Sequence, residues 1–175
     1  MQEKLLLYID DTDIFPNVTK IDKTIRRDRK ASKVILLDEN NNILLTGREH
    51  RLLPGGGLEV GESFEEAAIR ECKEEVGYDI QILYTIGFTD EFRSQEGRHQ
   101  VTYCFVAKIV GEQSTPTTIE EEEQGFIFEW LSVEDTISLL EKQKSTFTKE
   151  DYNGCFNVRT QLAFLSAYKS KMSLK

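Results

Sequence analysis

The glutamates of one segment, residues 53–78, are the side chains in this chain best suited to chemistry. In a helix, with about 100° per residue, Glu71 and Glu75 point in the same direction as the apolar Ala68 and Cys72. A solvated acidic face is the usual explanation of a glutamate-rich helix, but it would place these carboxylates opposite the apolar side. Like charges on an inward face are unfavourable unless cations neutralise them, and an all-oxygen site suits hard divalent cations such as Mg²⁺. The pattern therefore predicts a metal site.

A glycine-rich loop comes shortly before this helix. Gly55 to Gly57 permit backbone conformations that side chains would block, so that phosphates or metal can approach main-chain groups closely. Three glycines alone carry little information, because a tight turn explains them equally well. Ser63 and Glu66 have the spacing of a capping box, and Gly77 provides a left-handed stop. The sequence therefore predicts a helix over residues 64–76.

Length and charge restrict the class of protein. With 175 residues the chain has the size of one domain, and 39% hydrophobic with 30% charged residues is ordinary for a soluble globular protein. The formal net charge of -9, from 31 acidic and 22 basic residues, would repel a phosphate backbone, so we expect no nucleic-acid partner. An anionic small molecule would then require metal ions or a local arginine cluster to offset the repulsion.

The first residues and the cysteines indicate the compartment. Residues 1–10 hold one short apolar run and then turn acidic, which is typical neither of a signal peptide nor of a membrane span. We therefore expect a cytoplasmic protein without a membrane partner. Cys72, Cys104 and Cys155 are odd in number and far apart, which predicts reduced thiols rather than a disulfide framework or a zinc site.

The other elements predict a mixed α and β domain with antiparallel strand pairs. Apolar residues alternate from 82 to 88 and again from 101 to 109, which indicates two half-buried antiparallel strands. We expect residues 1–30, which include the basic stretch Arg26-Arg27-Asp28-Arg29-Lys30, to be an N-terminal extension packed on the core. Residues 31–175 are expected to form the domain, with its C-terminal helix. The run Leu5 to Ile9 either pairs as an edge strand in a homodimer or covers the core. Residues 34–45 are expected to form a hairpin, and residues 126–131 a strand that carries the single tryptophan. A helix capped by Ser132 follows, and residues 156–168 form a last helix.

The central segment resembles the signature of the Nudix hydrolase family, the Nudix box, at every polar and glycine position. In this chain the box spans residues 56–78. Gly56 is followed by five residues and Glu62, then by seven residues and the run 70–78, Arg-Glu-Cys-Lys-Glu-Glu-Val-Gly-Tyr. Cys72 and Tyr78 occupy the two positions that are aliphatic in the family pattern, which alters packing and leaves the acidic residues unchanged.

The resemblance implies both a fold and a reaction. The implied fold is a Nudix-like α/β/α sandwich with a mixed, partly antiparallel sheet over roughly residues 31–142. The implied enzyme is a metal-dependent pyrophosphohydrolase, in which water attacks phosphorus and cleaves a phosphoanhydride bond in a nucleoside di- or triphosphate derivative. Nucleoside triphosphates, ADP-ribose and other nucleotide sugars, and coenzyme A all belong to the range of the family. The sequence does not choose among them.

By resemblance, the box glutamates form the metal site. Glu71, Glu74 and Glu75 would bind Mg²⁺ or Mn²⁺, with Glu71 preferred as the base that deprotonates the attacking water. Gly56 would offer its carbonyl oxygen to the metal. A further acidic ligand is expected before the last strand, where Glu122 or Glu123 lies, although four adjacent glutamates are as often a solvated charge run.

The remaining candidates surround this site. Arg48 and Arg51 precede the glycine loop and are expected to bind a substrate phosphate. Gly55 and Gly57 are either substrate-binding or only part of a tight turn. The supporting residues are Arg70, four residues before Glu74 and expected to orient the carboxylates and the loop, and Glu62, expected to pack against the loop. Two looser groups are a basic set in a hairpin loop, Arg93, Arg98 and His99, and three aromatics able to stack on a base but more often found in a core, Phe92, Tyr103 and Tyr152.

Two other classes of protein compete with the enzyme. A non-catalytic sensor that binds nucleotides would share the fold, but such proteins usually lose box glutamates, and this chain keeps all of them. An acidic metal-buffering domain is disfavoured, because Asp11-Thr12-Asp13 lacks the remainder of a calcium-binding loop. The sequence therefore favours the hydrolase.

Overall fold

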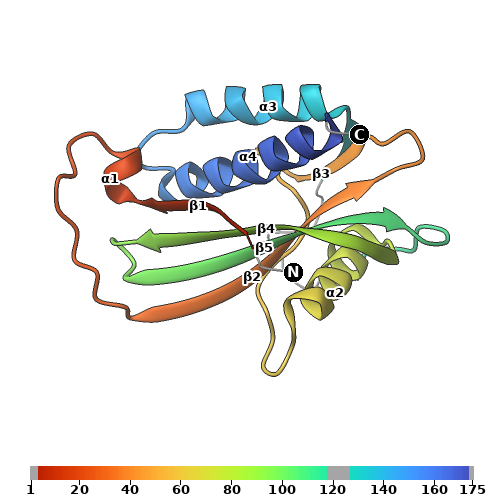
Figure 1. Ribbon diagram of the computed structural model, residues 1–175, viewed down its shortest axis with the longest axis horizontal. Coiled ribbons are helices and arrows are strands. Elements are labelled where there is room, and N and C mark those ends of the chain that lie inside the picture. The colour runs from red at the N-terminus through yellow and green to blue at the C-terminus, as the bar shows by residue number, and fades with distance from the viewer. Residues whose placement is uncertain (1–3, 118–126, 174–175) are drawn as a thin grey trace.

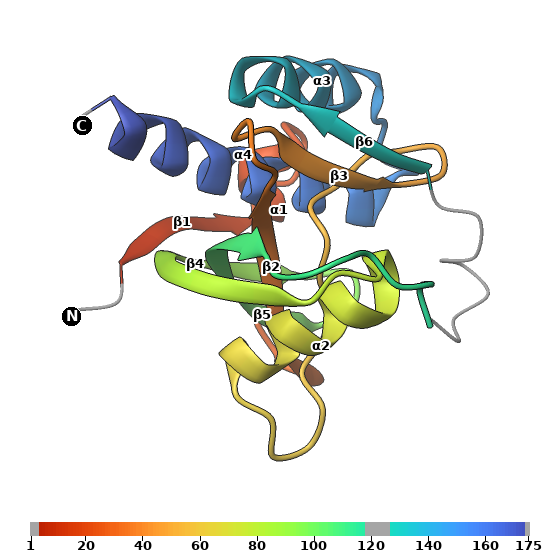
Figure 2. The same cartoon turned by 90° about the vertical axis from the view of Figure 1, so that its right-hand side faces the viewer.

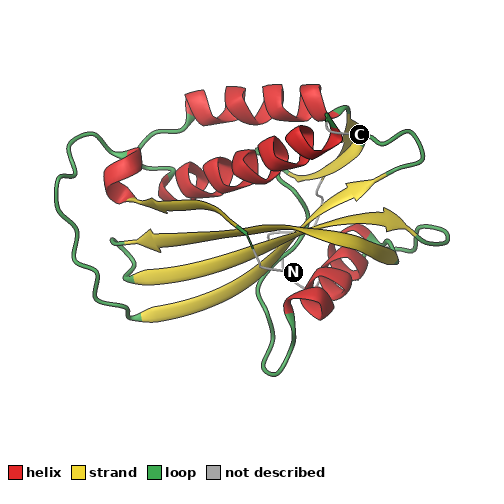
Figure 3. Cartoon of the chain, in the orientation of Figure 1, coloured by secondary structure: helices red, strands yellow, loops and turns green. Residues whose placement is uncertain are grey.

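One mixed six-stranded sheet forms the centre of the molecule, in the strand order β1-β4-β5-β2-β3-β6. The computed structural model describes residues 4–117 and 127–173. Figure 1 and Figure 3 show the sheet with α2 on one face and α3 and α4 on the other, which confirms the expected α/β fold. The strands are β1 (Leu5–Asp10), β2 (Arg27–Leu37), β3 (Ile43–Gly47), β4 (Ile80–Arg93), β5 (Arg98–Ile109) and β6 (Ile127–Leu131), and the helices are α1 (Asp11–Ile14), α2 (Phe64–Val76), α3 (Val133–Thr146) and α4 (Tyr152–Met172).

Each face of the sheet has its own apolar core. Between the sheet and α2, Ala68 and Cys72 pack against Val34 and Phe105. On the other face, α3 and α4 pack on the sheet and form the larger core. Its buried residues are Ile35, Leu37, Ile43, Leu45, Leu53, Ile86, Cys104, Val106, Leu140, Val158, Leu162, Phe164, Leu165 and Tyr168. The alternation along β2 and β5 follows from this arrangement, because successive side chains of a strand point to opposite faces.

The alternation in β4 does not keep one face. Its antiparallel register with β5 shifts between Ile82 and Tyr84 and again between Thr85 and Gly87. Ile82 therefore packs on the side of α2, whereas Tyr84 and Ile86 pack on the side of α4. A β-bulge inserts an extra residue and reverses the faces of those that follow, so the periodicity predicted the strand correctly but not its orientation.

The helix boundaries follow local signals. The expected span of α2 is confirmed, with Ser63 as N-cap in a capping box and Gly77 as a left-handed C-cap at φ 75°. A side chain at Gly77 would bring its Cβ to 2.0 Å from the Ser114 carbonyl oxygen, so the close approach also requires glycine. The predicted Ser132 cap of α3 is confirmed, and α4 extends beyond the expected span at both ends.

The N-terminal strand belongs to the same sheet as the rest of the chain. β1 pairs in parallel with β4 at the sheet edge, and α1 follows it directly, as the red segment of Figure 1 shows. Asp11 is buried and accepts hydrogen bonds from the Tyr152 hydroxyl at 2.9 Å and the Ser94 amide at 2.8 Å. β2 begins at Arg27, so Arg27, Arg29 and Lys30 lie in a central strand. The division into an extension and a domain remains a prediction.

The expected hairpin between β2 and β3 creates the place for the glycine loop. β2 and β3 pair only at Leu37 and Ile43, and β3 then diverges to pair with β6, as seen in Figure 2. The loop occupies the vacated edge of β2, where the Ser32 amide donates to the Gly56 carbonyl at 2.9 Å and the Leu58 amide to Lys30 at 3.1 Å. The loop is therefore held as an additional extended segment beside a central strand.

Two global features concern membranes and thiols. In the ranges 4–117 and 127–173, no helix has both the length and the apolar character needed to cross a bilayer. Cys72, Cys104 and Cys155 are all free and buried, as reduced thiols would be.

Candidate active site

A cleft of about 820 Å³ lies where the glycine loop, the α4-facing surface of the sheet and α4 itself meet. Glu71 and Glu75 of α2 reach this cleft beside Gly55, Gly56 and Gly57. The other residues that line it come from β2, β5, the β3 loop and α4: Arg29, Ala31, Lys33, Thr46, Gly47, Arg48, Glu49, His50, Leu52, Leu53, Gln100, Thr102, Asn157, Thr160 and Gln161. The structure thus places the loop and two of the box glutamates together.

The two inward glutamates contact the loop differently. Glu75 is buried, with 7% of its surface exposed, and its Oε2 accepts from the Gly55 amide at 2.8 Å. Glu71 packs over Gly56, where a Cβ would lie 2.4 Å from Glu71 Oε1. A side chain at position 56 would therefore displace the Glu71 carboxylate, which explains why the loop requires glycine there.

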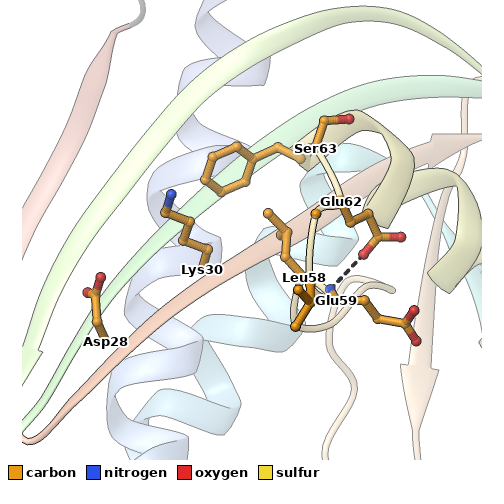
Figure 4. Close-up of a pocket in the computed structure, with 9 residues that line it drawn as sticks. Asp28, Lys30, Leu58, Glu59, Glu62 and Ser63 are labelled. Atoms are coloured by element: carbon orange, nitrogen blue, oxygen red, sulfur yellow. Dashed lines mark hydrogen bonds between the residues drawn. The ribbon is translucent and has the colours of Figure 1, made fainter.

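Arg70 links the helix, the loop and three carboxylates. Its Nε donates to Glu62 at 2.8 Å, its Nη1 to Glu71 at 2.9 Å and Glu74 at 3.0 Å, and its Nη2 to the Gly57 carbonyl at 2.9 Å. The hydrogen bonds to Glu62, then those to Glu74 and Glu71, raise the pKa of Arg70, while the bond from Arg70 lowers the pKa of Glu62. Figure 4 shows Glu62 folded back to accept from the Glu59 amide. These contacts fix the shape of the loop.

The donor set fits Mg²⁺ in number and in chemistry. No group of three His, Cys, Asp or Glu side chains placed to hold a metal occurs in the described parts of the chain. Glu74 turns to Arg70 and does not line the cleft, and Glu122 and Glu123 lie outside the described residues. Mg²⁺ keeps several waters and needs only one or two protein carboxylates besides substrate phosphates. Glu71 and Glu75 therefore fit a Mg²⁺ ion, and the metal roles expected of all these residues remain predictions.

Carbonyl groups of the loop already accept hydrogen bonds. The Gly56 oxygen accepts from the Ser32 amide at 2.9 Å, and the Gly55 oxygen accepts from Lys33 Nζ. Lys33 Nζ also donates to the Leu53 carbonyl at 3.0 Å. A carbonyl oxygen has two lone pairs, so these contacts leave one available on each glycine.

The two arginines before the loop have different positions. Arg48 lines the cleft, but Arg51 does not. Arg51 Nη1 donates to the carbonyls of Gly47, at 2.8 Å, and Arg48, and its Nε lies 3.8 Å from Glu129. Arg51 therefore closes its own turn, and the expectation that it binds substrate has no support from its position. Spacing along the sequence could not distinguish the two, since both precede the loop.

Several cleft residues were missed by sequence reasoning. Arg29 belongs to the basic stretch assigned to the extension, yet it lies in β2, two residues before Ala31 on the same face. Gln100 and Thr102 occupy the positions between the alternating apolar residues of β5, so the period of two could have indicated that they face the opposite side. Asn157 and Gln161 are one turn apart on α4.

The looser candidates are mostly structural. Phe92 and Tyr152 are buried, and Tyr103 packs between Phe64 and Phe88 on the α2 side, so none of the three lines the cleft. The hairpin-loop interpretation of the basic set was wrong, because it ends β4 and begins β5: Arg93 is the last residue of β4, and Arg98 and His99 are the first of β5.

Comparison with known proteins gives a consistent result. The family model described as NUDIX domain matches residues 27–150. A putative 8-oxo-dGTP diphosphatase of Bacillus subtilis is 39% identical over 84 residues, which are 46% of this chain and 54% of that protein. An ADP-ribose pyrophosphatase of Methanocaldococcus jannaschii is 32% identical over 83 residues, 43% of this chain and 48% of that protein. The chain thus spans about half the length of these two relatives. The solution structure of the E. coli ORF135 protein superposes with a TM-score of 0.61 at 16% identity, covering 85% of this chain and 94% of that one, which supports the fold alone.

Proposed function

We propose, from the premise that this chain belongs to the NUDIX domain family, that it hydrolyses a phosphoanhydride bond in a nucleotide-like small molecule with a divalent metal. The observation that carries this proposal is the meeting of Glu71 and Glu75 with Gly55 to Gly57 in one cleft. The two carboxylates are one helical turn apart and point at a loop whose backbone a phosphate can approach closely.

The residues in and around the cleft have different roles in such a reaction. Glu75 is buried and fixed by the Gly55 amide, which suits a metal ligand, and Glu71 is the preferred group to take the proton from the attacking water. Bound Mg²⁺ or Mn²⁺ would lower the pKa of that water and neutralise charge on the phosphates. Arg48 and Lys33 bring positive charge to the same cleft of an otherwise acidic protein. Arg70 positions Glu71 and the loop without lining the cleft itself.

The substrate belongs to the nucleoside di- or triphosphate derivatives. The two relatives named above are a putative 8-oxo-dGTP diphosphatase and an ADP-ribose pyrophosphatase. The names of related proteins therefore include both a triphosphate and a nucleotide sugar as substrates. We expect water to attack one phosphorus and a nucleoside monophosphate to leave, with turnover that requires Mg²⁺ or Mn²⁺ and stops with a chelator.

A panel of nucleotides with a matched set of variants tests the proposal. Glu71→Gln and Glu75→Gln should each reduce turnover at least about 100-fold, the usual contribution of a general base or a metal ligand. Glu65→Gln removes the same charge from an exposed position of the same helix and should retain parental activity. Product release is measured with Mg²⁺, with Mn²⁺ and with EDTA, and circular dichroism checks the fold.

One outcome would contradict the site assignment and another the hydrolase. Parental rates in both glutamine variants would show that α2 does not hold the reaction centre. Binding of nucleotides without turnover of any panel member would favour the alternative, a non-catalytic NUDIX-fold sensor.

A further inference from the structure

One surface of the cleft is rich in hydrogen-bond donors. We call it the donor wall and define it by five residues that line the cleft: Arg29, Gln100, Thr102, Asn157 and Gln161. They come from β2, β5 and α4, and the wall reaches the glycine loop at Arg29, whose Nη2 lies 3.3 Å from the place of a Cβ on Gly57.

Each amide oxygen of the donor wall already accepts a hydrogen bond within the protein. Each accepts from a group that can only donate: Gln100 Oε1 from Arg29 Nη1 at 3.0 Å, Gln161 Oε1 from the Leu53 amide at 2.7 Å, and Asn157 Oδ1 from Arg93 Nη2 at 2.7 Å. A guanidinium or a backbone amide cannot accept, so these partners determine which end of each amide faces them. The NH₂ ends are therefore directed to other contacts.

Several donors of the wall are unused. Gln100 gives an N–H to Thr102 Oγ1 at 3.0 Å, which leaves the Thr102 hydroxyl proton for another acceptor. Asn157 Nδ2, Gln161 Nε2 and the remaining N–H groups of Arg29 have no hydrogen-bond partner among residues 4–117 and 127–173. A ligand that supplies acceptors would therefore satisfy these donors.

The charge of the wall points the same way. Arg29 is only partly exposed and forms no ion pair with any carboxylate in the described parts of the chain. Burial lowers the pKa of Arg29, the nearby positive charges of Arg93 and Arg27 lower it further, and the charges of Glu91 and Glu71 oppose this only in part. The described residues that line the cleft include no Phe, Tyr or Trp on which a base could stack. An acceptor-rich anion suits this surface better than a nucleobase.

We propose that the donor wall binds a phosphate, and that the substrate is a pyrophosphate compound with at least one phosphate beyond the two joined by the cleaved bond. The second part rests on the proposed hydrolase function. The additional phosphate is either the next one in the phosphate chain, as in a triphosphate, or a monoester elsewhere on the molecule, as on a ribose. Arg29 is the specificity-determining residue, because it is the cation of the wall and forms no ion pair in the described parts of the chain.

Binding measurements with pairs of probes test this inference. Each pair differs by one phosphate: inorganic triphosphate against pyrophosphate, and NADP⁺ against NAD⁺. Calorimetric titrations of the full-length protein in EDTA separate binding from turnover. We expect the more phosphorylated member of one pair to bind about 10-fold tighter or more, the size of a charge-assisted contact. The first pair reports a chain phosphate and the second a monoester.

Variants assign the preference to the wall. Arg29→Met should reduce the preference to about 2-fold or less, and Arg29→Lys should restore part of it. Arg26→Gln removes a charge from an exposed residue three positions earlier and should leave it unchanged. Thr102→Val, which keeps shape and loses one donor, provides a second test if Arg29→Met does not fold.

The two proposals fail separately. Equal binding within both pairs, or an unchanged preference in Arg29→Met, would overturn the donor wall even if nucleotides are hydrolysed. A phosphate preference that depends on Arg29 in a protein without turnover would contradict only the hydrolase.

Discussion

Arg93 and Arg29 lie on neighbouring parts of the same sheet face, but the fold treats them in opposite ways. Arg93 is 2% exposed, and its guanidinium binds both Glu91 oxygens at 3.0 Å, contacts Asn153 and Asn157, and lies over the Phe156 ring. Arg29, at the cleft, contacts a single amide oxygen.

The difference separates charge used for folding from charge kept for binding. A buried ion pair is strongly destabilised when one partner is removed, because the other charge is left without compensation. When a guanidinium that faces a cleft is removed, the protein loses little stability but much of its affinity for an anion. The same residue type therefore predicts different phenotypes at the two positions.

The largest effect is expected from removing Arg93. Arg93→Met should lower the free energy of unfolding by about 3–5 kcal/mol, since it leaves Glu91 buried and unpaired. Arg29→Met should lower it by less than about 1 kcal/mol. Urea unfolding of the two variants measures both values. Similar losses in the two would remove the distinction between them.

Arg70 provides an intermediate case, because its network is closed and also touches the candidate site. Arg70→Met should destabilise by about 1–2 kcal/mol and reduce turnover about 10-fold or more, since Glu71 and the Gly57 carbonyl lose their partner. Lys73, on the same helix as Arg70, forms an exposed pair with Asp79. Lys73→Met breaks this pair and should change neither stability nor turnover. If both variants behaved alike in unfolding and turnover, the network would have no special role.

His99 should give the smallest effect, and one that depends on pH. It bridges Asp28 of β2, at 2.8 Å, and Asp90 of β4, at 2.9 Å. Partial burial opposes ionisation, but the two hydrogen bonds outweigh it and raise the pKa of His99 above its usual 6.5. Because the folded pKa is the higher one, this stabilisation is complete below the unfolded pKa and is lost as pH rises through the folded pKa.

Thermal unfolding of the parent and of His99→Gln measures this linkage. The parent should be more stable by about 0.5 kcal/mol or less at about pH 6, and the difference should shrink by about pH 9. A difference that grows with pH would show that the charged imidazole is not the stabilising form.

Local signals were sufficient for the helix that carries the box. The Ser63 cap and the Gly77 stop act within a few residues of their helix, so the span of α2 and the inward direction of Glu71 and Glu75 could be read from the chain. The roles of Arg70 and Glu62 beside the loop were expected for the same reason, since their partners lie within the same short segment.

Contacts between distant segments were not readable in this way. The bulges that turn β4 over depend on its register with β5, and the position of Arg51 depends on Gln143 of α3, which binds its backbone. In the sequence Arg29 is part of a basic stretch, and only the pairing of β2 with β5 places it beside Gln100.

The sequence by itself determined the helix that carries Glu71 and Glu75, the glycine loop and the family, because those features depend on neighbouring residues. Only the tertiary structure decided which arginine is closed in the core and which faces the cleft, and which end of each amide remains available there. Those properties depend on donors and acceptors that β2, β5 and α4 bring together from positions far apart in the chain.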